Sequence, residues 1–238
     1  MMSEIKTWGI IGGGMLGMTL ALRLTEQGHK VTMFESAGKV GGLTSSWEMD
    51  GDVWDRFYHV ILMSDLNTRK ILKEIGLEDD LRWVTTRTGF YSNGKLYSMS
   101  NIIEFFNFPP MNLVDKFRLG LTLFAASKIK DGVKLDIIWV PDWLTRWSGK
   151  RVFEKIWLPL LKAKLGENYK NTSAAFIWTT IQRMYAARKS GLKKEMFGYV
   201  TSCYEKINQR FADHLLKSGV NIQYNSKVKS VKKISDKM

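Results

Sequence analysis

The residue types best suited to chemistry lie near the N-terminus. Gly12, Gly14 and Gly17 have the spacing G-x-G-x-x-G, and Glu35 follows them by about 20 residues. The first glycine allows a tight turn, the second lets an anionic group approach the backbone, and the third lets a helix pack closely. The carboxylate can accept hydrogen bonds from ribose hydroxyls and repels a 2′-phosphate. These residues indicate a dinucleotide site that disfavours a 2′-phosphate.

The elements around these residues fit that interpretation. Apolar runs at residues 8–11 and 31–34 predict two strands, and a helical stretch between them ends at Gly28. Three leucines at helical spacing predict the face that lies on the sheet: Leu16, Leu20 and Leu24. The sequence therefore predicts an α/β, Rossmann-like fold. The alternative is an ordinary glycine-rich strand-to-helix turn that holds no ligand.

A second glycine pair, Gly41 and Gly42, comes just after Glu35 and precedes Leu43 and Thr44. With this pair the chain resembles the group of FAD-dependent amine oxidases, protoporphyrinogen oxidases and phytoene desaturases. In that group a glycine doublet passes close to the pyrophosphate and ribitol of the flavin, and an arginine often stands where this chain has Leu43. The resemblance implies FAD as cofactor and a mainly helical substrate domain inserted into the FAD-binding domain. A glycine turn with polar neighbours is the alternative.

The motif and the resemblance together give a predicted cofactor-binding set. It consists of Gly12, Gly13, Gly14, Met15, Leu16, Gly17, Glu35, Ser36, Gly41, Gly42, Leu43, Thr44 and Val228. The resemblance continues at Asp55, Tyr58 and His59. His59 is the candidate for proton transfer, because its ordinary pKa lies near neutrality. The alternative is a packed, hydrogen-bonded structural histidine, so no catalytic residue is assigned firmly.

Composition sets the limits on the class of protein. The chain has 238 residues, of which 45% are hydrophobic and 25% are charged, which is typical of a globular protein with one or two domains. The single cysteine, Cys203, excludes an internal disulfide and a cysteine-based metal site. We therefore expect no metal and a reducing, cytoplasmic location. No apolar run approaches the length of a membrane span.

The net charge of +13 is strongly basic, and three interpretations remain open. The first is a solvated basic face. The second is nucleic acid, which we do not expect because no nucleic-acid motif accompanies the charge. The third is peripheral contact with the inner face of a membrane. Residues 116–130 place Phe117, Leu121, Phe124 and Ala125 on one helical face between basic residues, and four tryptophans follow. Packing inside the protein is the alternative use of these side chains.

The expected organisation follows the family plan. Residues 1–88 form the FAD-binding segment, 89–190 the substrate-domain insertion, and 191–238 the return to the FAD-binding domain. A helix is predicted over 66–75, a hairpin with an Asn-Gly turn over 89–97, and mostly helix over 112–188. Two strands are predicted over 219–224 and 228–234.

Two departures from the family pattern matter. Ser202 and Cys203 stand where the family has a glycine pair, and Cys203 could serve either as a redox thiol or as a small buried residue. Family members also run longer and carry a later Gly-Asp segment. The resemblance therefore implies an N-terminal portion, a truncated gene or half of a two-chain enzyme.

The function implied is an FAD-dependent oxidoreductase that removes hydride from a C–N or C–C bond of a hydrophobic substrate. An amine, a tetrapyrrole or an isoprenoid would suit an apolar, aromatic substrate domain. The alternatives are an NAD-linked enzyme or a flavin-dependent nucleotide-sugar mutase on the same scaffold, and a non-catalytic nucleotide-binding remnant. The residues indicate no particular oligomeric state.

Overall fold

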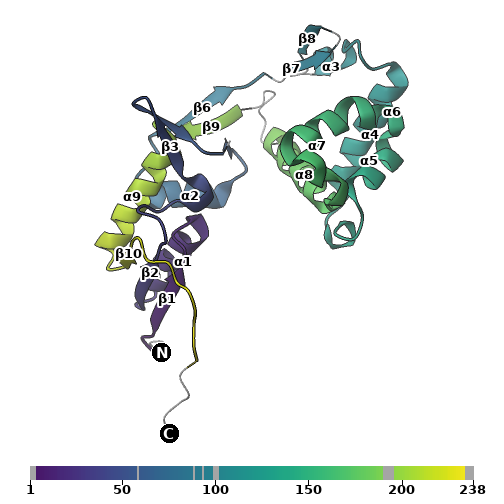
Figure 1. The fold of residues 1–238 in the computed structure, drawn as a ribbon. Coiled ribbons are helices and arrows are strands. Elements are labelled where there is room, and N and C mark those ends of the chain that lie inside the picture. The colour runs from purple at the N-terminus through teal and green to yellow at the C-terminus, as the bar shows by residue number, and fades with distance from the viewer. Residues whose placement is uncertain are drawn as a thin grey trace. The chain divides into compact units, whose positions relative to one another are not determined.

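The computed structural model forms two compact units (Figure 1). It describes residues 4–57, 59–87, 89–92, 94–98, 102–189 and 196–233, with the side chains of 185–189 excepted. The first unit comprises Met1–Ile61, Asp65–Trp83 and Gly198–Met238, and the second comprises Leu62–Ser64 and Val84–Phe197. The chain thus changes units near residues 83 and 197, whereas the sequence suggested 88 and 190.

A parallel sheet with the order β1-β2-β10 organises the first unit. Its strands are β1 (Thr7–Ile11), β2 (Lys30–Phe34) and β10 (Asn221–Gln223). The helix α1 (Met15–Glu26) connects β1 to β2, as parallel neighbouring strands require. Gly28 follows the helix with a φ of 82°, a left-handed conformation that favours glycine at a helix end. The predicted α/β class is confirmed.

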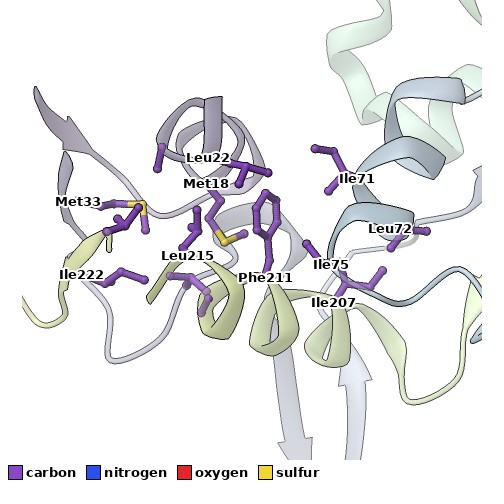
Figure 2. Close-up of a cluster of buried hydrophobic side chains, with 14 of the residues drawn as sticks. Met18, Leu22, Met33, Ile71, Leu72, Ile75, Ile207, Phe211, Leu215 and Ile222 are labelled. Atoms are coloured by element: carbon purple, nitrogen blue, oxygen red, sulfur yellow. The ribbon is translucent and has the colours of Figure 1, made fainter. Parts of the chain in front are cut away.

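The core of the first unit lies where α1 meets α2 (Leu66–Glu74) and α9 (Cys203–Lys217). Figure 2 shows Phe211 and Leu215 of α9 projecting toward Met18 and Leu22 of α1, with Ile75 nearby. Each of these five side chains is buried. The helix predicted over 66–75 is confirmed as α2, with Ile75 as its C-terminal cap. Helices from both ends of the chain therefore share one core.

The predicted apolar face of α1 is wrong for two of its three leucines. Leu16 is 85% exposed and Leu20 is 46% exposed, whereas Leu24 is buried. The buried stripe of the helix instead runs through residues between them, namely Met18, Ala21, Leu22 and Leu24. Residues two positions apart lie about 200° apart around a helix, so burial of Met18 turns Leu16 and Leu20 outward.

The strand predicted over residues 228–234 is also wrong for 228–233, the part that the structure describes. The sheet order β1-β2-β10 leaves the outer edges of β1 and β10 without a partner strand among the described residues, yet residues 228–233 pair with neither edge. Four of the seven residues from 227 to 233 are lysines, whose mutual repulsion opposes close pairing. The strand predicted over 219–224 is present as β10.

Several short strands complete the sheet structure. β3 (Ser46–Met49) and β4 (Asp52–Asp55) form an antiparallel hairpin. β5 (Ile61–Leu62), β9 (Met196–Val200) and β6 (Leu81–Thr85) form a second sheet in the order β5-β9-β6. These three strands lie where the chain passes between the two units.

The second unit is mainly helical after an initial hairpin, as the sequence predicted. The hairpin pairs β7 (Gly89–Ser92) with β8 (Lys95–Ser98), and Asn93 of its turn lies outside the described residues. The α-helices are α3 (Ile102–Phe106), α4 (Leu113–Lys128), α5 (Val140–Ser148), α6 (Lys150–Val152), α7 (Leu158–Leu165) and α8 (Ala174–Lys189). Shorter helical turns cover Val133–Leu135, Phe153–Trp157 and Gly166–Asn171.

Of the four tryptophans between residues 139 and 157, two lie in the core of this unit. Trp143 and Trp157 are 5% and 6% exposed, and the indole N–H of Trp157 donates to the buried hydroxyl of Ser148 at 2.9 Å. The other two tryptophans of the region, Trp139 and Trp147, are 49% and 39% exposed. Two of these four tryptophans therefore pack in the core, and the other two keep surface exposed to solvent. Among the described residues, no helix has the length and apolarity needed to cross a membrane.

Candidate nucleotide-binding site

The first glycine loop is shaped by contacts that only glycine permits. Gly12 has a φ of 100°, and its N–H donates to the carbonyl of Phe34 at 2.8 Å. A Cβ on Gly17 would lie 2.0 Å from the carbonyl oxygen of Gly12, so a side chain there would force the helix off the loop. Gly17 is thus required for the close packing of α1, as its position in the motif predicts.

The N-terminus of α1 is open to an anion. Gly14 precedes the helix and has no side chain that could cap the first N–H groups. The first turn, from Met15, carries no acidic side chain that would repel a phosphate. A Cβ on Gly14 would meet nothing nearer than 3.9 Å, so the space beside this residue is not filled by protein. These features suit a pyrophosphate at the helix N-terminus.

The second glycine segment lies directly against the first. The N–H of Gly41 donates to the carbonyl of Gly13 at 2.8 Å, and Gly14 and Gly41 form a parallel bridge. A Cβ on Gly42 would be 3.2 Å from the Cα of Gly14. Leu43, next in the chain, is 72% exposed. The structure therefore brings residues 12–17 and 41–44 of the predicted set into one site.

Glu35 is buried behind the glycine loop rather than projecting freely from it. Its Oε2 accepts from the N–H of Gly13 at 2.6 Å, and its Oε1 accepts from the N–H of Ala37 at 2.8 Å and from the hydroxyl of Ser36 at 3.2 Å. Burial raises the pKa of this carboxyl, but the hydrogen bonds from Ala37, Gly13 and Ser36 outweigh it, and the pKa lies below its usual value. Glu35 is therefore an ionised group, and one acceptor position remains on Oε2 for a ribose hydroxyl.

Asn208 of α9 holds the second glycine segment, and the sequence analysis missed it. Its Nδ2 donates to the carbonyl of Thr44 at 2.8 Å, and its Oδ1 lies 2.9 Å from the Thr44 hydroxyl, which also lies 2.8 Å from the carbonyl of Gly41. The side chain is 2% exposed. A signal was present, because Asn208 is a polar residue beside the apolar positions Ile207 and Phe211 of an amphipathic helix.

Glu205 makes a second link from α9 to the same region. One carboxylate oxygen pairs with Lys39 at 3.0 Å, and the other accepts a hydrogen bond from the hydroxyl of Ser46. Lys39 and Ser46 flank the Gly41–Thr44 turn on either side. α9 thus fixes that turn from both ends.

The remaining candidates lie outside the glycine segments. The Nδ1 of His59 is 2.7 Å from the carbonyl of Phe57, and its ring is 4.9 Å from the ring of Tyr204, while Tyr58 lies outside the described residues. Val228 is half-buried on the segment that follows Ser226, whose N–H donates to the Glu35 carbonyl at 2.8 Å. Among the described residues no cluster of His, Cys, Asp and Glu could hold a metal ion.

Ser202 and Cys203 occupy left-handed backbone positions, with φ values of 71° and 63°. This conformation is normally taken by glycine, the residue that the resemblance led us to expect. Burial raises the pKa of the Cys203 thiol, and the charge of Asp55 raises it further. Since the thiolate is the reactive form, these surroundings disfavour a redox role for Cys203.

The sequence of this chain is similar to those of known proteins. The family model for flavin-containing amine oxidoreductases matches residues 16–238. A zeta-carotene desaturase from a Synechocystis species is 24% identical over 95% of this chain and 51% of its own length. A 15-cis-phytoene desaturase from Arabidopsis thaliana is 23% identical over 93% of this chain and 42% of its own. The chain thus spans about half the length of the curated relatives it matches.

Solved structures share the fold. A putrescine oxidase matches with a TM-score of 0.67 and 17% identity, over 92% of this chain and 50% of its own. The two glycine segments, the open helix N-terminus and the ionised Glu35 fit the ADP half of FAD, the cofactor that the family indicates. Because the family model matches nearly the whole sequence, the chain belongs to the family of flavin-containing amine oxidoreductases.

Proposed function

We propose that this chain supplies the ADP-binding part of an FAD-dependent oxidoreductase that removes hydride from a C–N or C–C bond of a hydrophobic organic substrate. The observation that carries the proposal is the meeting of the two glycine segments at the N-terminus of α1. A loop that served only to connect a strand to a helix would not need this second glycine pair against it. FAD supplies the ring that accepts the hydride.

The residues of the chain act by binding and orienting. The N–H groups at the start of α1 hold the pyrophosphate, and Gly14 and Gly42 let it approach the backbone. Glu35 fixes the Gly13 peptide and offers the remaining acceptor position of Oε2 to the adenosine ribose. A 2′-phosphate would face an ionised carboxylate at this point, which favours FAD or NAD over NADP.

The substrate class is supported by the relatives' names and by the second unit. Zeta-carotene and phytoene are apolar, whereas putrescine is an amine, so the relatives cover both C–C and C–N bonds. In this chain Trp143 and Trp157 are occupied by packing. Trp139 and Trp147 keep exposed surface that is available to an apolar substrate.

A comparison of three glycine variants tests the cofactor site. Gly14→Ala adds a methyl group whose nearest protein atom, the carbonyl oxygen of Gly41, is 3.9 Å away, on extended backbone that alanine adopts. Folding is therefore retained while the pyrophosphate space is filled. Gly17→Ala places a methyl group 2.0 Å from a backbone oxygen and should disrupt the unit. Gly120→Ala lies on α4, where nothing is within 4 Å, and is the matched control.

The readout is the visible absorption of protein desalted after incubation with FAD, with circular dichroism melting as the measure of folding. We expect retained flavin for the wild type and Gly120→Ala. Gly14→Ala should melt as the wild type does and bind FAD at least about tenfold more weakly, a loss of about 1.4 kcal/mol. A folded wild-type chain that retains no flavin, or a Gly14→Ala variant that binds equally well, contradicts the proposal. Binding of NAD alone would support an NAD-linked enzyme instead.

A further inference from the structure

The outer face of α4 carries a stripe of large apolar side chains that nothing in the described structure covers. Its members are Leu113 (75% exposed), Val114 (59%), Phe117 (71%), Leu121 (43%) and Phe124 (53%). At 100° per residue they fall within about 100° of the helix circumference. The opposite face of the same helix is buried in the core of the second unit through Leu119, Thr122 and Ala126.

This stripe is more than a scatter of single apolar residues, which any protein surface has. Its five members occupy one side of a 16-residue helix, and two of them are phenylalanines. The helix is firmly anchored, because Asn112 and Asp115 form a capping box at its start and Arg151 pairs with Asp115 at 3.0 Å. α3 adds two more exposed apolar side chains, Ile103 and Phe106. The apolar face is therefore displayed on a rigid element.

The charge of the chain is concentrated in the unit that carries this stripe. Residues 84–197 contain 19 Lys and Arg against 8 Asp and Glu, which is +11 of the total +13. Arg118 and Lys128 are exposed on α4 itself, and the Nζ of Lys128 lies 5.1 Å from the centre of the Phe124 ring. Basic side chains around an apolar stripe are complementary to a surface that is apolar inside and negatively charged outside.

We propose that this face of α4 is a docking surface for an anionic membrane, on which the helix lies in the plane of the interface. The phenylalanines enter the boundary between headgroups and acyl chains, and Arg118 and Lys128 contact anionic headgroups. A second copy of this chain is a poor occupant, because it would bring another strongly positive unit against the first. The proposal does not depend on bound FAD or on the enzymatic function.

Vesicle co-sedimentation of the full chain tests the proposal, with phosphatidylcholine vesicles compared with vesicles that also contain phosphatidylglycerol. The test variant is Phe117→Glu/Phe124→Glu. The control is Leu216→Glu/Val231→Glu, which makes the same change in charge at two exposed apolar sites of the first unit. A third variant, Phe117→Ser/Phe124→Ser, removes the apolar groups without adding charge. All four side chains are exposed, and circular dichroism melting checks that each variant is folded.

We expect the wild type to bind the anionic vesicles, to bind phosphatidylcholine more weakly, and to lose affinity as salt rises. The test variant should bind anionic vesicles at least about tenfold more weakly than the control variant, with the serine variant between them. Wild-type protein that stays in the supernatant, or test and control variants that bind alike, overturns the proposal. The proposal is also overturned if the wild type sediments as a dimer and the test variant is monomeric, while the two bind vesicles alike. That result would assign this face of α4 to a second copy of the chain.

Discussion

Asn208 offers the sharpest test of how the site is built, because its partners belong to a turn far away in the sequence. Asn208→Leu keeps the approximate volume of the side chain and removes its polar atoms. The Thr44 hydroxyl retains an acceptor, since it already lies 2.8 Å from the Gly41 carbonyl. The Thr44 carbonyl is the group that loses its donor, in a place where the side chains of both residues are buried. An unpaired buried carbonyl costs about 1–3 kcal/mol, which is the expected fall in the free energy of unfolding.

Asn208→Leu should also weaken the binding of FAD. Asn208 fixes Gly41–Thr44, so FAD binding must reorder this turn in the variant, and affinity should fall by up to the same 1–3 kcal/mol, about 5- to 150-fold. Urea unfolding followed by circular dichroism gives the first quantity, and titration of the flavin absorption gives the second. Gln209→Leu, on the exposed side of the same helix, is the control. If Asn208→Leu and Gln209→Leu unfold and bind FAD alike, the turn does not depend on Asn208 and the reasoning is wrong.

Two further predictions concern an ionised group and a backbone conformation. Because the folded state lowers the pKa of Glu35 from 4.5, its charge stabilises the fold above about pH 4.5, and this contribution is lost as pH falls through the folded-state pKa. The excess stability of the wild type over Glu35→Gln in urea unfolding should therefore shrink on acidification, and a difference independent of pH would contradict this. Ser202→Gly should raise the free energy of unfolding by about 1 kcal/mol, because it relieves a left-handed serine. The control Ser218→Gly, at a φ of −83°, should lower it, and equal effects would refute the strain argument.

Local patterns were enough to predict the elements of the nucleotide site. The glycine spacing, the two apolar runs and the acid after the second run are contained in about 30 consecutive residues, where spacing along the chain translates directly into geometry. The second glycine pair follows within a few residues. The resemblance placed this pair near the pyrophosphate of the cofactor, but the hydrogen bond between Gly41 and Gly13 was not predicted.

Contacts between distant segments could not be predicted in this way. Asn208 lies 164 residues from Thr44, and no spacing rule connects a helix residue to a loop so far away. The failure on α1 has a related cause. Leu16 and Leu20 are as apolar as Leu22, and the positions of the β1-β2 sheet and of α9 together decide which stripe is buried. Periodicity shows that a helix has an apolar side, but here several stripes were possible and tertiary packing chose between them.

The position of Glu35 shows why a motif residue can have more than one task. The motif assigns Glu35 to the ribose, and that role requires the carboxylate only when a nucleotide is bound. In the structure its Oε2 already accepts from Gly13, and a Cβ on Gly13 would be 3.0 Å from this same oxygen. The carboxylate therefore holds the glycine loop through a contact within the protein itself. Replacing Glu35 should then destabilise the ligand-free protein as well as weaken FAD binding, whereas a residue used only for the ribose would affect binding alone.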